Sequence, residues 1–386
     1  MIARFPVYVV IACVAAVSIL VSRPDAEAGK ADSKVGGKVL SGVQTGNPEI
    51  KAISQISFGP GGLLLVGDRG RAAVLAIQTG DKGPVQRLKA PVKNVAARAA
   101  EAMGAKPGSV GIVDMTVNPE SGRIYLAVLR TQGKQYAILT VDAAGKFSHL
   151  DLDNASYVRV SLPAAEQEQI SNITDVEFAG DRVLAAGQSN GAFRSKIFSI
   201  PVPLTHGSSA EIFSAETYHV SHRRWETRAP ISSFVPYEED GKNFIVGSFA
   251  CTPIAKFPLD DVQSGAKIMG TSVVELGSGN RPLDMFTYRK DGKTWLVTNT
   301  NRFHHEKRPI GPSPFWGVRV DMEYMKSAEV NEKAARRNAT KRSGPEGMDV
   351  VEVLFGVTQV AKLNDDEMIV IRENGKAFDL EVAQLP

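Results

Sequence analysis

A short pattern of apolar and polar positions recurs six times along the chain. Each copy begins with an apolar residue, has a polar residue at its third position and then returns to an apolar residue, as in Ile173-Thr-Asp-Val-Glu-Phe. A turn and a second apolar run follow each copy. Such recurrence is typical of a repeat architecture. The copies begin at Ile53, Ile112, Ile173, Ile231, Pro282 and Val357.

The segments after each copy favour antiparallel β-hairpins. Residues 59–62 (Gly-Pro-Gly-Gly) lead to the apolar run 63–66, and residues 118–122 lead to the run 124–128. Short loops of Gly, Asn and Asp between β-rich runs are strong hairpin signals. A third apolar run follows in several copies, for example residues 73–77. The copies recur about every 60 residues, against ~40–50 for a usual propeller blade. We predict an all-β fold, a β-propeller of six blades.

Insertions account for part of the extra length. Residues 92–103 are rich in alanine and predict a short helix, and residues 322–349 form a charged insertion without strand periodicity. A seventh blade is the alternative if residues 316–320 (Trp-Gly-Val-Arg-Val) are a degenerate copy. A pair of β-sandwiches is the competing fold, although sandwiches do not need a repeating pattern. The strand at Val39 and Leu40 is expected to close the ring as the fourth strand of the last blade.

The first residues predict an export signal. A basic start is followed by an almost wholly apolar run over residues 5–21 and by the small-residue pattern Ala26-Glu27-Ala28. We predict a signal peptide at 1–28, a linker at 29–36 and one propeller domain at 37–386, secreted or periplasmic. An uncleaved N-terminal anchor is the alternative. A lipoprotein signal at Cys13 fits less well, because the apolar run continues past the cysteine. No later stretch predicts a membrane span.

Charge and cysteine content narrow the class of protein. The formal net charge is +3, from 45 basic and 42 acidic residues, which does not favour nucleic acid as a partner. There are two cysteines, and Cys13 lies in the predicted signal. Cys251 then has no partner for an internal disulfide, and we interpret it as a structural thiol. We expect a monomer stabilised by its core.

The stretch from Tyr218 to Leu259 is the most distinctive in the chain. It contains Trp225-Glu-Thr-Arg-Ala-Pro-Ile231, Phe234-Val-Pro-Tyr237 and Cys251-Thr-Pro-Ile-Ala-Lys-Phe-Pro258, with Asn280-Arg-Pro-Leu-Asp-Met285 downstream. In these segments the chain resembles a family of exported bacterial β-propeller proteins, over most of its mature length. The resemblance implies a shape related to the quinoprotein amine dehydrogenase-like and YVTN-repeat propellers. It carries no catalytic residues over.

The third positions of the repeat predict a polar ring. In a propeller the innermost strands line the central channel, so equivalent positions meet around it. These positions are Gln55, Asp114, Asp175, Ser233, Asp284 and Gln359. Loops after the second strands and before the fourth copy add Arg130, Asn190, Asn299, Asn301 and Trp225 to the predicted ligand-binding mouth. Carboxylates and amides are hard oxygen ligands, so a Ca²⁺ site at Asp114, Asp175 and Asp284 is one hypothesis. A hydrated, hydrogen-bonded channel lining is the other.

Two histidine pairs are further candidates. His219 and His222 precede the fourth copy, and His304 and His305 follow the second strand of the fifth. Histidines three residues apart can share a metal, but no acidic or cysteine partner stands at a familiar interval, which favours solvated loops. The sequence has no G-x-S-x-G, H-E-x-x-H, P-loop or C-x-x-C-H motif.

Two classes of function follow. The first is a binding module that holds a small molecule or a protein at the channel mouth. The alternative is a propeller enzyme, either a Ca²⁺-dependent hydrolase of lactonase or esterase type or a quinone-dependent dehydrogenase. The sequence indicates the place of the site more firmly than its chemistry.

Overall fold

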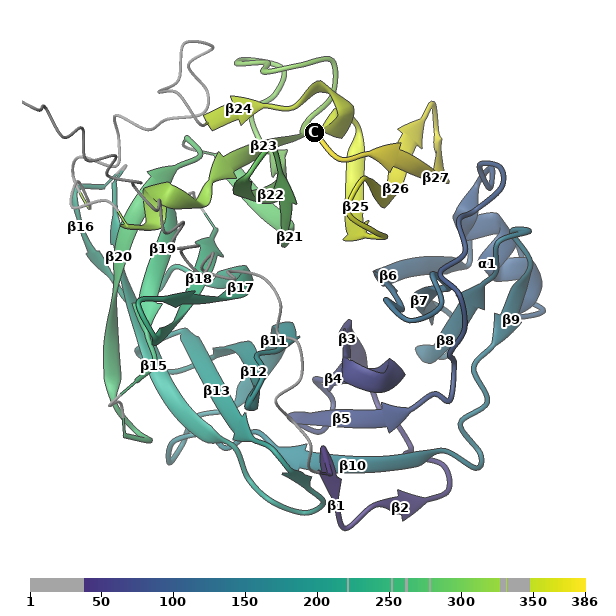
Figure 1. Ribbon diagram of the computed structural model, residues 1–386, viewed down its shortest axis with the longest axis horizontal. Coiled ribbons are helices and arrows are strands. Elements are labelled where there is room, and N and C mark those ends of the chain that lie inside the picture. Colours follow the sequence, from purple (N-terminus) through teal and green to yellow (C-terminus); the bar gives the residue numbers. More distant parts are fainter. Residues whose placement is uncertain are drawn as a thin grey trace, which may run out of the picture.

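The computed structural model describes residues 38–220, 222–250, 253–260, 263–277, 279–326, 331 and 348–386. Within these ranges the chain is almost entirely β-structure, arranged as sheets around a central axis (Figure 1). The exceptions are one α-helix, α1 (Val95–Ala102), and short 3-10 turns that include η1 (Pro60–Gly62), η2 (Met322–Lys326) and η4 (Glu352–Leu354). The all-β class is therefore as predicted.

Four antiparallel sheets form separate blades. The first has the order β2 (Gln44–Thr45), β10 (Ser156–Ser161), β5 (Ala73–Gln78), β4 (Leu63–Asp68) and β3 (Ile53–Gly59). The second contains β6 (Val110–Val117), β7 (Ile124–Arg130), β8 (Gln135–Val141) and β9 (Phe147–His149). Another contains β21 (Asn280–Lys290), β22 (Lys293–Arg302), β23 (Phe315–Asp321) and β24 (Met348–Val350). The last contains β25 (Val357–Lys362), β26 (Glu367–Asn374) and β27 (Ala377–Gln384).

The middle of the chain forms one larger sheet that nearly closes on itself. Its order is β11 (Ile170–Phe178), β12 (Arg182–Ser189), β13 (Ser195–Pro201), β15 (Glu211–His219), β20 (Lys267–Glu275), β19 (Pro253–Pro258), β18 (Lys242–Phe249) and β17 (Ile231–Glu239), with β16 (Arg224–Glu226) paired to β15. Its strands pair antiparallel except β15 and β20, which are parallel. The two end strands, β11 and β17, contact each other. Two short strands, β1 (Leu40–Ser41) and β14 (Leu204–Thr205), pair in parallel outside these sheets.

The six copies of the repeat form the innermost strands β3, β6, β11, β17, β21 and β25 of the described chain. Each of these strands contacts two others, in the order β3, β11, β17, β21, β25, β6 and back to β3. This closed order differs from the order along the sequence, because β3 lies between β6 and β11. The chain leaves the first sheet after β5, builds β6 to β9, and returns as β10 to pair with β5 (Figure 1).

The copies also share an irregularity of pairing. In each inner strand the register against the second strand shifts at the start of the copy, for example between Ile53 and Gln55 and between Ile112 and Asp114. The same shift occurs in β11, β17, β21 and β25. A β-bulge of this kind bends the strand, re-aims a side chain and leaves backbone groups out of the ladder. The polar third position stands at each bulge.

Apolar second and third strands hold the sheets together. Leu126, Val128 and Leu139 pack with Ile369 and Leu380 between the second sheet and the last one. Burial of a leucine-sized side chain stabilises the fold by about 2 kcal/mol. Helix α1 packs on this same cluster through Val95, Ala99 and Ala100. It begins later than the predicted residues 92–103, because Asn94 is its N-cap and accepts from the Ala97 amide.

The strand at Val39 and Leu40 does not close the last blade. Leu40 pairs with Leu204 of β14, while β2 pairs with β10, so this part of the chain covers the first sheet and the larger sheet. The outer edge of β27 is instead covered by the segment before α1. There the Val92 amide donates to Leu380 O at 2.8 Å, and the Leu380 amide donates back at 2.9 Å. The ring closes through the contact of β25 with β6.

Residues 316–320 do not begin a seventh blade. They lie in β23, which pairs with β22 and is the third strand of the sheet that begins at β21.

The predicted signal at 1–28, the linker at 29–36, Cys13 and Cys251 lie outside the described residues, as does most of the charged insertion at 322–349. Within the described chain we find no helix with the length and apolar character needed to cross a membrane.

Candidate functional site

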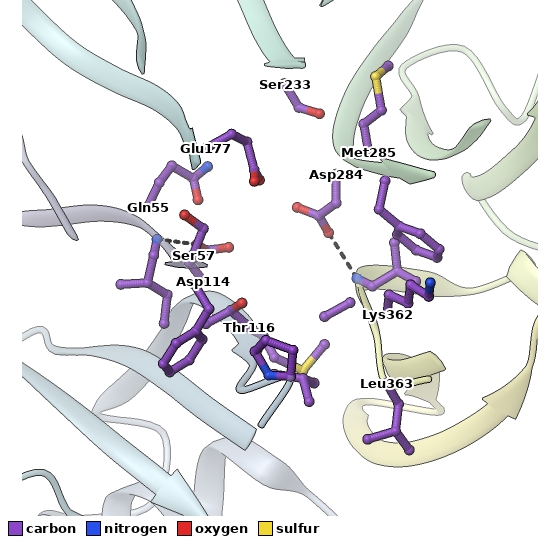
Figure 2. A pocket seen from close by; sticks show the side chains of 18 of the residues that line it. Gln55, Ser57, Asp114, Thr116, Glu177, Ser233, Asp284, Met285, Lys362 and Leu363 are labelled. Atoms are coloured by element: carbon purple, nitrogen blue, oxygen red, sulfur yellow. Dashed lines mark hydrogen bonds between the residues drawn. The ribbon is translucent and has the colours of Figure 1, made fainter. Parts of the chain in front are cut away.

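The inner strands surround a central cavity of about 440 Å³. Residues at the third and fifth positions of five of the six copies each line it, because alternate residues of a strand point to the same side. Figure 2 shows the carboxyl groups of Asp114, Glu177 and Asp284 directed toward its centre. Its polar lining is Gln55, Ser57, Asp114, Thr116, Asp175, Glu177, Ser233, Asp284, Lys362, Asn364 and Asp365.

The three third-position aspartates bridge neighbouring inner strands. Each accepts a hydrogen bond from the backbone amide at the fourth position of the next strand. The amides of Ile56, Phe234 and Val360 donate to Asp114, Asp175 and Asp284, respectively, at 2.7, 2.7 and 2.9 Å. Each of these amides belongs to the residue that directly follows the register shift of its strand. Each aspartate therefore joins two neighbouring inner strands as well as lining the cavity.

The two third-position glutamines also bridge neighbouring inner strands, but they donate the hydrogen bond, whereas the aspartates accept it. Gln55 Nε2 donates to Thr174 O at 3.0 Å, and Gln359 Nε2 donates to Val113 O at 3.2 Å. All five bridges run in the same sense around the ring of inner strands, each reaching the next strand in the closed order. Ser233 is too short to make the sixth, from β17 to β21, and its buried hydroxyl has no hydrogen-bond partner among the described residues.

Glu177 is a fourth carboxyl group in the cavity. It occupies the fifth position of the third copy, two residues after Asp175, and therefore shares the cavity face of β11. It is not among the site residues predicted from the sequence, although alternation along a strand was a sufficient signal. Ser57 and Thr116 occupy the same position of the first and second copies and were missed for the same reason.

Burial and mutual repulsion favour the protonated forms of these acids. Burial raises the pKa of Asp175 and of Asp284 from 3.8 to about 7, although backbone amide donors act against the shift. Burial, followed by the charge of Asp284, raises the pKa of Asp114 well above its usual range. Burial, then the charges of Asp175 and Asp114, does the same for the pKa of Glu177. Clustered carboxyls without a cation behave in this way.

One cationic side chain in the described lining stands at the edge of this cluster. Lys362 Nζ forms an ion pair with Asp365 Oδ1 at 3.0 Å. Among the described residues, Asp114, Asp175, Glu177 and Asp284 therefore have no ion-pair partner. No three of the four carboxyl groups have oxygen atoms within 4.8 Å of one another, so they form no preformed three-ligand metal site. Of the described residues, a single trio of His, Cys, Asp or Glu has ligand atoms within 4.8 Å of one another, and it lies elsewhere.

The remaining predicted site residues do not line the cavity. Asn299 is fully buried, where its Oδ1 accepts from the Asp284 amide at 2.9 Å and its Nδ2 donates to Val357 O at 3.1 Å, so it supports the ring from behind. Arg130 and Asn301 lie at the ends of β7 and β22, and Asn190 follows β12 and accepts from the Gln169 amide. Trp225 packs edge-on against Tyr218, with ring centroids 5.7 Å apart. Gln359 is absent from the cavity lining, although its side chain bridges to Val113 O.

The first histidine pair has an acidic neighbour that was not predicted from the sequence. Glu226 stands four residues after His222, and the two side chains are 2.8 Å apart. His219 lies 3.8 Å from the same carboxylate. His304 and His305 lie in the loop after β22 and are not part of this trio.

No protein-family model matches this chain, and no curated protein sequence matches it either. Solved structures with a comparable arrangement include the PQQ-bound aldose sugar dehydrogenase of Streptomyces coelicolor, at 13% identity and a TM-score of 0.35, over 88% of this chain and 98% of that one. Kuenenia stuttgartiensis hydrazine synthase matches at 11% identity and a TM-score of 0.37, over 88% and 97%. Trypanosoma rangeli sialidase matches at 10% identity and a TM-score of 0.37, over 87% and 55%. Likenesses this distant support no inference about ligand or activity.

Proposed function

We propose that the central cavity binds a small organic cation, an amine with an apolar body. The observation that carries this proposal is the cluster of four carboxyl groups, Asp114, Asp175, Glu177 and Asp284, facing one cavity without a paired cation among the described residues. A bound ammonium group would relieve their mutual repulsion and supply the missing charge. A cavity of this volume falls in the range of small-molecule sites.

The walls favour an organic cation over a bare metal ion. Phe58, Met115, Met285 and Phe286 line the cavity beside the acids and would contact an alkyl or aryl group. Aromatic faces also attract cations. Ca²⁺ requires six to eight oxygen ligands at about 2.4 Å, and the acids lie too far apart to provide a preformed set. We therefore favour the organic cation and keep Ca²⁺ as the alternative ligand.

Titration calorimetry with matched ligands tests the proposal. Primary amines from ethylammonium to 2-phenylethylammonium are each compared with the corresponding alcohol, which keeps the shape and removes the charge. We expect saturable binding of at least one amine and no binding of its alcohol. Binding should release protons, because the cation stabilises the ionised carboxylates, and the measured heat should therefore change with the ionisation enthalpy of the buffer.

Matched variants distinguish the cavity from other acidic surfaces. Glu177→Gln should weaken amine binding by about tenfold or more, corresponding to about 1.4 kcal/mol. Glu239→Gln removes a carboxylate that pairs with Lys256 at 2.7 Å and does not line the cavity. It should leave binding unchanged. Equal binding of amine and alcohol would contradict the proposal, and Ca²⁺ binding lost in Glu177→Gln would replace it with the calcium alternative.

A hydrolase is the second candidate, and the raised pKa values favour it. Asp175 and Asp284 have pKa values of about 7, so at neutral pH the cavity holds both protonated and ionised carboxyls. One could donate a proton to a leaving group while another activates water. Hydrolysis of an ester, lactone or glycoside that is lost in Glu177→Gln, but not in Glu239→Gln, would support this function over simple binding.

The blade count and cellular location are also proposals. Divided between its parallel strands β15 and β20, the larger sheet becomes two four-stranded blades that begin at β11 and β17. Added to the four separate sheets, these give the predicted six. The export signal predicted at residues 1–28 supports a secreted or periplasmic monomer that meets its ligand outside the cytoplasm.

A further inference from the structure

The hairpin formed by β15 and β16 gathers three metal-ligating side chains outside the central cavity. In its antiparallel register His219 is opposite Arg224 and Thr217 is opposite Glu226. His219 and Glu226 therefore share one face of the hairpin, while Tyr218 and Trp225 pack together on the other. His222, from the connecting turn, turns back onto the first face, where its ring centroid is 4.5 Å from that of His219.

The three side chains are spaced for one ion. One ligand atom from each of His219, His222 and Glu226 lies within 4.8 Å of the others. Glu226 Oε2 is 3.8 Å from His219 Nδ1, and Glu226 Oε1 is 2.8 Å from His222 Nδ1. Ligands of a tetrahedral zinc ion at about 2.0–2.1 Å are roughly 3.3 Å apart, so small side-chain movements would suffice.

His219 supplies an independent indication of a ligand. Its side chain is 1% exposed, yet neither ring nitrogen has a hydrogen-bond partner among the described residues. The Ala250 backbone lies near the ring without reaching hydrogen-bonding geometry. A buried polar group without a partner costs about 1–3 kcal/mol, so native structures seldom leave one without a reason. A metal ion between Nδ1 and Glu226 Oε2 would satisfy it.

We propose that His219, His222 and Glu226 bind a divalent transition-metal ion of the zinc class. Two imidazole nitrogens and one carboxylate suit Zn²⁺ better than Ca²⁺ or Mg²⁺, which prefer oxygen. Three protein ligands leave a fourth position for water, as in open zinc sites. That position faces solvent on the side of His222, whose side chain is 45% exposed.

The neighbouring charges are compatible with this site. Arg224 Nε donates to Glu226 Oε1 at 2.9 Å, so Oε1 is occupied and Oε2 remains for the metal. A hydrogen-bonded hairpin without a metal is the competing explanation.

Zinc titration of the full chain, stripped with a chelator, tests the proposal. We expect one Zn²⁺ per chain in calorimetry and a rise in melting temperature that Ca²⁺ and Mg²⁺ do not produce. His222→Ala should weaken zinc binding by at least about tenfold while the protein stays folded, because the side chain is exposed. Glu226→Gln keeps acceptor and donor atoms on the hairpin and should weaken zinc binding to a similar extent.

Histidines elsewhere provide the matched control. His304→Ala and His149→Ala remove an exposed imidazole outside the trio and should leave zinc affinity unchanged. A Co²⁺ derivative of the wild-type chain should show visible absorption from low-coordinate cobalt, absent in His222→Ala. The proposal is overturned if the stripped protein binds no zinc, or if zinc binding survives His222→Ala and Glu226→Gln.

Discussion

At the scale of single residues, each third-position aspartate has two roles. One oxygen accepts the backbone amide of the next inner strand, and the side chain also lines the acidic cavity. The sequence predicted the shared position of Asp114, Asp175 and Asp284 because the repeat aligns them. It could not predict their partners, because Asp114 accepts from the preceding copy, through Ile56, whereas Asp175 and Asp284 accept from the following copies.

Replacing Asp284 by asparagine should flatten the pH dependence of stability. Burial raises the pKa of Asp284 from 3.8 to about 7, so between these values the folded protein holds a proton that the unfolded chain releases. Stability then falls as pH rises from about 4 to about 7 and levels off above that range. The asparagine side chain would still offer an oxygen to the Val360 amide, without the charge.

Urea unfolding at pH 5 and pH 8 measures this effect. We expect the loss of unfolding free energy between the two values to be smaller in Asp284→Asn than in the wild type by about 1 kcal/mol or more, since one pKa unit corresponds to about 1.4 kcal/mol. Asp151→Asn removes an exposed carboxylate away from the cavity and should behave like the wild type. An equal loss in all three proteins would contradict the raised pKa.

At the scale of elements, the repeat predicted the inner strands closely but not how they pair. The copies at Ile53 and Val357 begin β3 and β25, as the apolar pattern indicated. The bulge in each strand escaped prediction, because a register shift depends on the partner strand and leaves no separate mark in the apolar pattern. The β15–β16 hairpin escaped for a similar reason, since the proximity of His219 and Glu226 depends on pairing across a turn.

Removing one bridge should weaken the junction between two inner strands. Gln55→Leu keeps most of the side-chain volume but loses the hydrogen bond to Thr174 O, which leaves a buried carbonyl without this donor. We expect a loss of about 1–2 kcal/mol of unfolding free energy. Gln44→Leu also removes a side-chain bond, to Gly42 O, but at an exposed position, and should cost less than about 0.5 kcal/mol. Equal losses would show that the bridge does not stabilise the ring.

At the scale of the whole molecule, the chain path could not be predicted from the repeat. Six similar copies suggest neighbours in sequence order, whereas β3 lies between β6 and β11 because β10 returns to the first sheet. The same return moves the N-terminal strands away from the last sheet. The edge of β27 is then covered by residues before α1, where Lys93 Nζ lies 2.8 Å from Asp379 Oδ2 and the Asn94 amide donates to Asp379 Oδ1 at 2.9 Å.

Hydrogen exchange on two variants should locate the ring closure. Asp379→Ala removes a nearly buried carboxylate that fixes this segment, so we expect faster amide exchange in β27 and a loss of roughly 1–3 kcal/mol of unfolding free energy. Deleting residues 38–45 should instead speed exchange in β10 and β14, which pair with β2 and β1, and leave β27 protected. Asp181→Ala, which breaks an exposed pair with Arg182, serves as the control and should change neither region. Faster exchange in β27 after the deletion would contradict this prediction, because it would show that the N-terminal strand protects the edge of the last sheet.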